Sequence, residues 1–96
     1  MPIPLHVYAH DAFDLLLHEA KELTEDTLKK VTEDVATLCG HYAYKLGMSD
    51  EDITKWLQSN YGAIFVRRTL LRPPFSLKEL GKLMIKARQS KAKLIN

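Results

Sequence analysis

Residues 25–46, EDTLKKVTEDVATLCGHYAYKL, carry the strongest periodic signal in the chain. Apolar side chains recur there every three or four residues, which is the spacing of one face of an α-helix. The stripe consists of Leu28, Val31, Val35, Leu38, Tyr42 and Leu46, with Cys39 and Ala43 beside it. Thr24 precedes the stretch as an N-cap, and Gly47 stands just past its end. We therefore expect one long central helix of about 33 Å.

A glycine lies inside this expected helix. Gly40 comes directly after Cys39 in this helix. Glycine in a helix interior costs about 1 kcal/mol relative to alanine. Its presence at this position indicates either a close crossing by another helix or a kink.

The first ten residues, MPIPLHVYAH, alternate apolar side chains with prolines and a histidine. Two prolines this close together oppose a helix and favour an extended arm, with a short edge strand as the alternative. A first helix is expected to follow over about residues 12–23, with Asp11 as its cap.

Two more helices are expected after the long one, and each opens at a serine. Ser49 and Ser76 are followed three residues later by an acidic residue, which is the capping-box pattern. Residues 63–72 between them are ambiguous. Their branched and aromatic side chains favour a strand, whereas their apolar spacing and helical surroundings favour a short helix. We interpret this segment as a helix that ends before the two prolines at 73 and 74.

These elements predict an all-α fold of one domain, residues 1–96, built as a small bundle of four to five helices around the long central one. An extended arm (1–10) precedes an acidic helical half (11–52) and a basic helical half (53–96).

Residues 1–52 contain 11 acidic and 4 basic residues, a net of −7. Residues 53–96 contain 1 acidic and 10 basic residues, a net of +9, so the overall +2 conceals a strong separation. Such a separation of charge indicates the kind of binding partner more than it indicates the fold.

The last expected helix is the clearest candidate for a binding surface. Its apolar residues share one arc of the helix: Leu77, Leu80, Leu83, Met84, Ala87 and Leu94. Its lysines share the opposite arc: Lys78, Lys82, Lys86 and Lys93. Such a helix is able to dock on its own domain and still offer mobile cations to phosphates. The competing interpretation is a merely solvated, solubilising face.

Three arginines, Arg67, Arg68 and Arg72, lie just before that helix. With residues 49–60 as a supporting helix and 63–72 as a recognition helix, the order resembles a helix–turn–helix, and the arginines would contact guanine edges or phosphates. The alternative is ion pairing with the acidic half of the chain or of a partner subunit.

Three side chains of the first half raise the question of a metal. His10, Asp14 and His18 are spaced four residues apart, and imidazole and carboxylate are ligands that zinc or nickel accepts. The set has no convincing fourth ligand, so we predict neither a metal nor another cofactor. Cys39 is interpreted as a buried, small apolar residue.

No catalytic fingerprint is present in the sequence, so a non-enzymatic protein is expected. No apolar run reaches the roughly 18 residues that a membrane span needs, and no membrane association is predicted. The single cysteine excludes an internal disulfide and favours a reducing compartment, so we expect a cytoplasmic protein.

Two functions follow from these features. The first is a small nucleic-acid-binding or regulatory protein that contacts phosphates, duplex DNA being favoured, through its basic half. The second is a protein–protein interaction module, such as an adaptor, inhibitor or accessory subunit, that uses its acidic and basic faces. Under either function, a homodimer through Leu28, Val31, Val35 and Leu38 is a reasonable hypothesis, because a thin core leaves this stripe exposed.

Overall fold

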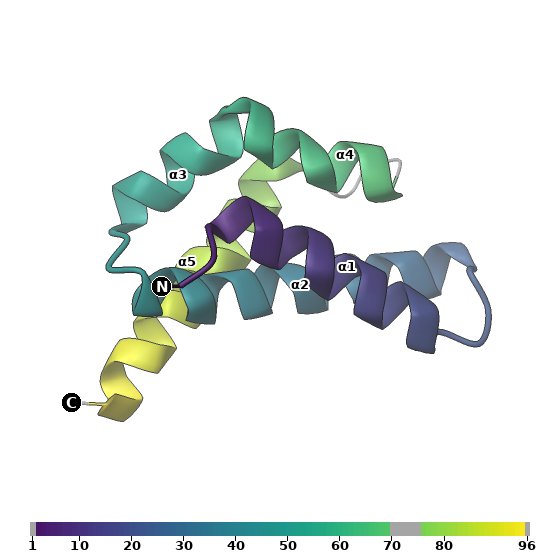
Figure 1. Cartoon of the computed structure of the whole chain (residues 1–96), viewed down its shortest axis with the longest axis horizontal. Helices are drawn as coiled ribbons and strands as arrows, with labels where there is room; N and C mark the ends of the chain where they lie inside the picture. Colours follow the sequence, from purple (N-terminus) through teal and green to yellow (C-terminus); the bar gives the residue numbers. More distant parts are fainter. Residues whose placement is uncertain (1, 70–75, 96) are drawn as a thin grey trace.

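Helices α2 (Glu25–Lys45) and α5 (Leu77–Ile95) cross at the centre of the structure, a computed structural model that describes residues 2–69 and 76–95. Helix α1 (Leu5–Glu19) runs antiparallel to α2 along one side of it, as Figure 1 shows. Helix α3 (Asp50–Gln58), the 3-10 turn η1 (Asn60–Gly62) and α4 (Ala63–Thr69) form a second layer over this pair. The described residues contain helices and no strand, so the all-α prediction is confirmed.

The long helix forms where its apolar periodicity predicts it. Thr24 caps it by accepting a hydrogen bond from the Thr27 N–H, and Gly47 adopts a φ of 75° just past its end. This left-handed conformation suits glycine, which has no Cβ to clash with the backbone. The helix buries one face against both α1 and α5, and is therefore the centre of the core.

Gly40 marks a close crossing of α2 by α5. A Cβ at this position would overlap the Met84 carbonyl oxygen and would lie 2.7 Å from the Ala87 Cβ. The absence of a side chain lets the two backbones approach, which offsets the conformational cost of glycine inside a helix. The crossing is therefore the physical reason for this glycine.

The N-terminal helix differs from the prediction at both ends. It begins at Leu5 instead of about residue 12 and ends at Glu19, so the extended arm shrinks to residues 2–4. Pro4 serves as the N-cap in extended conformation, a position where its missing N–H costs nothing. The prolines therefore precede the helix without interrupting it, and residues 5–10 join its buried face through Leu5 and Ala9.

The helices after α2 follow the predicted caps. Ser49 and Asp52 form a reciprocal capping box at the start of α3, and the Ser76 hydroxyl accepts a hydrogen bond from the Glu79 N–H at the start of α5. The ambiguous segment is helical over Ala63–Thr69, with Phe65 packed edge-on against the Phe13 ring of α1. Helix α5 runs from Leu77, directly after the Ser76 cap, to Ile95.

The stripe proposed for a homodimer is partly used inside the chain. Val31 and Val35 are buried in the core, whereas Leu28 and Leu38 retain exposed surface. A dimer through all four residues would require the core to open. Val31 and Val35 are therefore packed within the chain, and a homodimer stays a prediction.

Candidate anion-binding surface on α5

Helix α5 is anchored by its inner face. Leu80, Met84 and Ala87 are buried against the rest of the bundle, and Gly81 brings the helix close to the Leu57 side chain of α3. These contacts fix how the helix is rotated about its axis. Any side chain on the opposite face is consequently held towards solvent.

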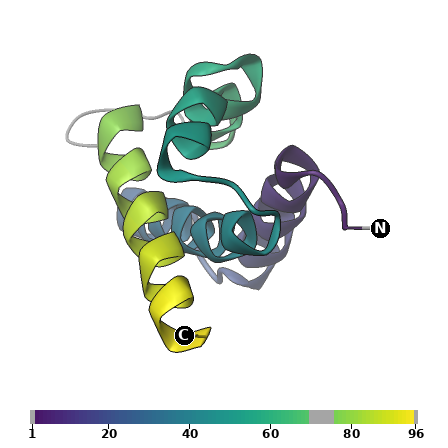
Figure 2. The same ribbon diagram turned by 90° about the vertical axis from the view of Figure 1, so that its left-hand side faces the viewer.

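The four lysines of the predicted surface all lie on that opposite face and are exposed: Lys78, Lys82, Lys86 and Lys93. We call this set the lysine face. Figure 2 shows α5 at one side of the molecule along most of its length, with the C-terminal turns extending beyond the body of the bundle. The structure therefore brings these four predicted residues together on one accessible surface.

The spacing of the lysine face suits a polyanion. Lys78, Lys82 and Lys86 recur once per turn, about 6 Å apart along the helix axis. One strand of DNA carries a charge about every 3.4 Å along the duplex axis, so lysines about 6 Å apart are spaced widely enough to contact separate phosphates. Lys82 has an ion pair with Glu79 at 3.6 Å, but both side chains are largely exposed. Such a pair is weak and leaves the cation available.

Arg88 has a different role from the lysines. Its Nε donates to the Met48 carbonyl oxygen, and its guanidinium contacts Asp50 Oδ1 at 3.1 Å. Gln89 donates to the other carboxylate oxygen of Asp50 at 3.0 Å. This cluster ties α5 to the start of α3, so Arg88 is a structural residue and one link between the acidic and basic halves. No local sequence pattern predicts this contact, because Arg88 lies far along the chain from Met48 and Asp50.

The arginines of the helix–turn–helix hypothesis are only partly covered by the structure. Arg67 is exposed on α4, the side chain of Arg68 lies outside the described part, and Arg72 lies outside the described residues altogether. The order of helix, turn and helix is present as α3, η1 and α4. However, α4 has seven residues, and the first turn of α3 contains three acidic residues, of which Glu51 and Asp52 are exposed. The recognition role of Arg67 stays a prediction.

The histidines and the cysteine do not form a site in the described part of the chain. No group of three or more His, Cys, Asp or Glu residues is placed there to hold a metal ion. His6 instead stacks on the Tyr61 ring, with centroids 4.3 Å apart. Cys39 is buried as predicted, and its burial raises the pKa of the thiol to about 12. A neutral, enclosed thiol is a packing residue.

Comparisons with protein-family models, with curated proteins and with solved structures find no match to this chain. Among the described residues, no helix is long and apolar enough to cross a membrane.

Proposed function

We propose that this chain is a small, non-enzymatic protein of the cytoplasm that binds nucleic acid, duplex DNA above all, by contacting phosphates with the lysine face of α5. One observation carries the proposal: four exposed lysines share one face of a helix whose other face is buried in the core. The rotation of the helix is thereby fixed, so its four ammonium groups stay on the solvent side. Lysine is a mobile point charge, so this contact follows the backbone and does not read base sequence.

The charge of the surroundings supports this surface over others. In residues 53–96 the lysine face has Glu79 as its single acidic neighbour in the sequence, whereas the first half of the chain is net negative. An approaching polyanion is therefore repelled by the α1–α2 side and attracted to the α5 side. The protein would orient itself on nucleic acid by this polarity.

Two variants of equal charge test the proposal. The first replaces Lys78, Lys82, Lys86 and Lys93 with glutamine. The second replaces the four lysines of the first half, Lys21, Lys29, Lys30 and Lys45, which are also exposed. Binding of a short fluorescent DNA duplex is measured by anisotropy at low salt, about 50 mM, where phosphate contacts are strongest.

We expect the α5 variant to bind at least tenfold more weakly than the unaltered protein. The first-half variant should bind at least tenfold more tightly than the α5 variant. Equal losses in the two variants would show that net charge alone matters. An unaltered protein that fails to bind at low salt would remove the proposal.

The alternative function is a protein–protein interaction module in which the lysine face meets an acidic protein surface. In this function the acidic face is used as well: the exposed carboxylates of α1 and of Glu51 and Asp52 in α3 would meet a basic partner. A pull-down that retains an acidic protein on the unaltered chain but not on the α5 variant, with no DNA binding by either, would favour this function.

Arg67 distinguishes two modes of DNA binding. If α4 reads bases, Arg67→Ala lowers the preference for one sequence over another, whereas Lys82→Ala weakens all sequences alike. Competition between duplexes of different sequence measures this difference. An Arg67→Ala variant with unchanged preference would leave the lysine face as the sole contact under test.

A further inference from the structure

Exposed apolar side chains gather along the seam between α1 and α2. Of the five large exposed apolar side chains among the described residues, Leu15 belongs to α1, Leu38 to α2, and Ile3 precedes α1, whereas Leu23 lies in the loop between the two helices and Tyr61 in η1. The rings of Tyr8 and Tyr42 stack across this seam with centroids 4.1 Å apart. Tyr42 Oη donates a hydrogen bond to the Ile3 carbonyl oxygen at 2.7 Å. Ile3 therefore lies at the tyrosine end of the seam.

The two leucines continue this apolar surface along the helices. Leu15 follows Tyr8 by two turns in α1, and Leu38 precedes Tyr42 by one turn in α2. Because α1 and α2 are antiparallel, both leucines lie in the same direction along the seam from the tyrosine pair. Leu15 is about 10 Å from Tyr8 along α1, and Leu38 is about 6 Å from Tyr42 along α2. The exposed fractions of Leu15 and Leu38 are 58% and 36%. We call these five residues, Ile3, Tyr8, Leu15, Leu38 and Tyr42, the α1–α2 strip.

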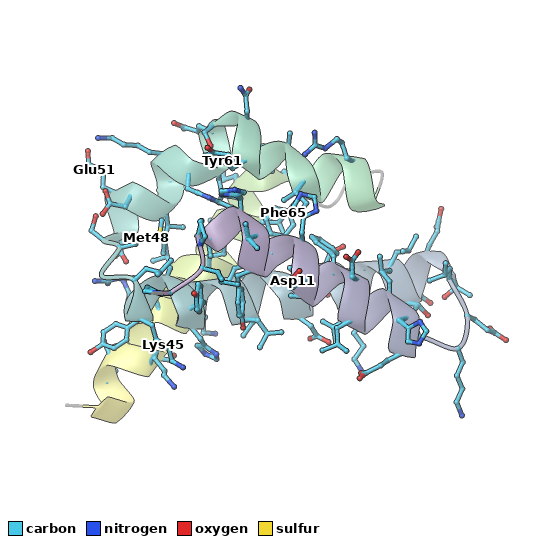
Figure 3. All side chains as sticks on the ribbon, viewed as in Figure 1. Asp11, Lys45, Met48, Glu51, Tyr61 and Phe65 are labelled. Atoms are coloured by element: carbon cyan, nitrogen blue, oxygen red, sulfur yellow. The ribbon has the colours of Figure 1, made fainter. Side chains whose placement is uncertain are left out.

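Carboxylates flank the strip. Asp11 and Glu19 lie one turn before and one turn after Leu15, and Asp34 lies one turn before Leu38. All three are exposed, and Figure 3 shows Asp11 on the outward side of α1. Lys45 stands near the end of α2 and offsets part of this charge. Helix α1 itself contains three acids and no lysine or arginine.

We propose that the α1–α2 strip is a docking site for a basic amphipathic helix of another protein. An apolar seam with an acidic border fits the leucines and the lysines of such a helix at the same time. Its use of the acidic half makes this proposal independent of the DNA-binding proposal for α5.

The charge of the strip argues against a second copy of this chain as the occupant. A symmetric dimer through the strip would set its three flanking carboxylates against the same three carboxylates. The chain's own basic helix is no substitute, because Leu80 and Met84 of α5 are buried in the core and are not free to fill the seam. The occupant is therefore a different, positively charged protein segment.

A labelled helical peptide built from leucine and lysine serves as the probe, and a scrambled peptide of the same composition serves as its control. Binding to the full chain is measured by fluorescence anisotropy. The test variant carries Leu15→Ser and Leu38→Ser. The matched control carries Leu23→Ser, since Leu23 is 65% exposed but lies between α1 and α2 in the sequence, off the strip. Circular dichroism checks that each variant is folded, as expected for changes at exposed positions.

We expect the amphipathic peptide to bind the unaltered chain more tightly than the scrambled one does. The double variant should lose at least tenfold in affinity, while the Leu23→Ser variant stays within twofold. Equal binding of the two peptides, or an equal loss in both protein variants, would overturn the proposal. A dimer of the unaltered chain that the double variant dissociates in sedimentation would also overturn it and would make a second copy the occupant.

Discussion

The two faces of α5 are under different packing constraints although they belong to one helix. The inner face is fixed by close contacts, above all where Gly40 lets the backbones of α2 and α5 approach. The outer face is a row of exposed lysines whose neighbours impose almost no packing constraint. Changes on the inner face should therefore alter stability, whereas changes on the outer face should alter binding.

The largest effect is expected at Gly40. In Gly40→Ala the new methyl group collides with the Met84 carbonyl and Ala87, so α5 must move away from α2. We expect a loss of about 3 kcal/mol in the free energy of unfolding, measured by urea titration. Gly81→Ala is the matched control, because its Cβ meets only the end of the Leu57 side chain, at 3.2 Å. It should change stability by less than about 1 kcal/mol. Equal losses in the two variants would refute the close crossing.

A smaller loss is expected at the edge between the two faces. Arg88→Ala removes a hydrogen bond to the Met48 carbonyl and an ion pair with Asp50, both partly buried. We expect unfolding to become easier by about 1–2 kcal/mol. The Lys55→Ala control removes an exposed ion pair with Glu51 and should cost less than about 0.5 kcal/mol. If both variants unfold alike, Arg88 does not link α5 to α3.

The capping box of α3 predicts a dependence on pH. Hydrogen bonding to Ser49 lowers the pKa of Asp52 in the folded chain. The bond with the backbone N–H of Ser49 has the larger effect, and the bond with its side chain has the smaller one. A lowered pKa means that the stabilisation is present above the unfolded pKa of about 4 and is lost as the pH falls through the folded pKa. Stability measured between pH 5 and pH 2 should therefore fall less steeply in Asp52→Asn. Identical pH profiles would contradict the role of this carboxylate.

Substitutions on the outer face of α5 should barely change the stability of the fold. Lys82→Gln removes an exposed cation and a weak pair with Glu79. We expect the free energy of unfolding to change by less than about 0.5 kcal/mol. A loss comparable to that of Arg88→Ala would show that the lysine face stabilises the fold instead of serving a partner.

The elements with strong local signals were predictable from the sequence. The apolar stripe with Thr24 and Gly47 gave the bounds of α2, and two serine caps gave the starts of α3 and α5. The lysine face was predictable for the same reason, because helical periodicity alone separates it from the buried arc.

Features that depend on tertiary contacts were not predictable in the same way. The predicted start of α1 was wrong, because the local sequence does not distinguish a proline that precedes a helix from one that prevents a helix. The packing of Leu5 and Ala9 decides between the two. The burial of Val31 and Val35 depends on how the other helices pack around α2. The Arg88 cluster joins residues nearly forty positions apart, which no local pattern reports.

The salt dependence of DNA binding tests the central claim most directly. Four lysines that each neutralise one phosphate predict that the logarithm of the association constant falls with the logarithm of salt concentration with a slope of about −3.6. The variant with glutamine at Lys78, Lys82, Lys86 and Lys93 should lose most of this slope, and the variant of the four first-half lysines should keep it. A slope near zero in the unaltered protein, or an unchanged slope in the α5 variant, would contradict the account.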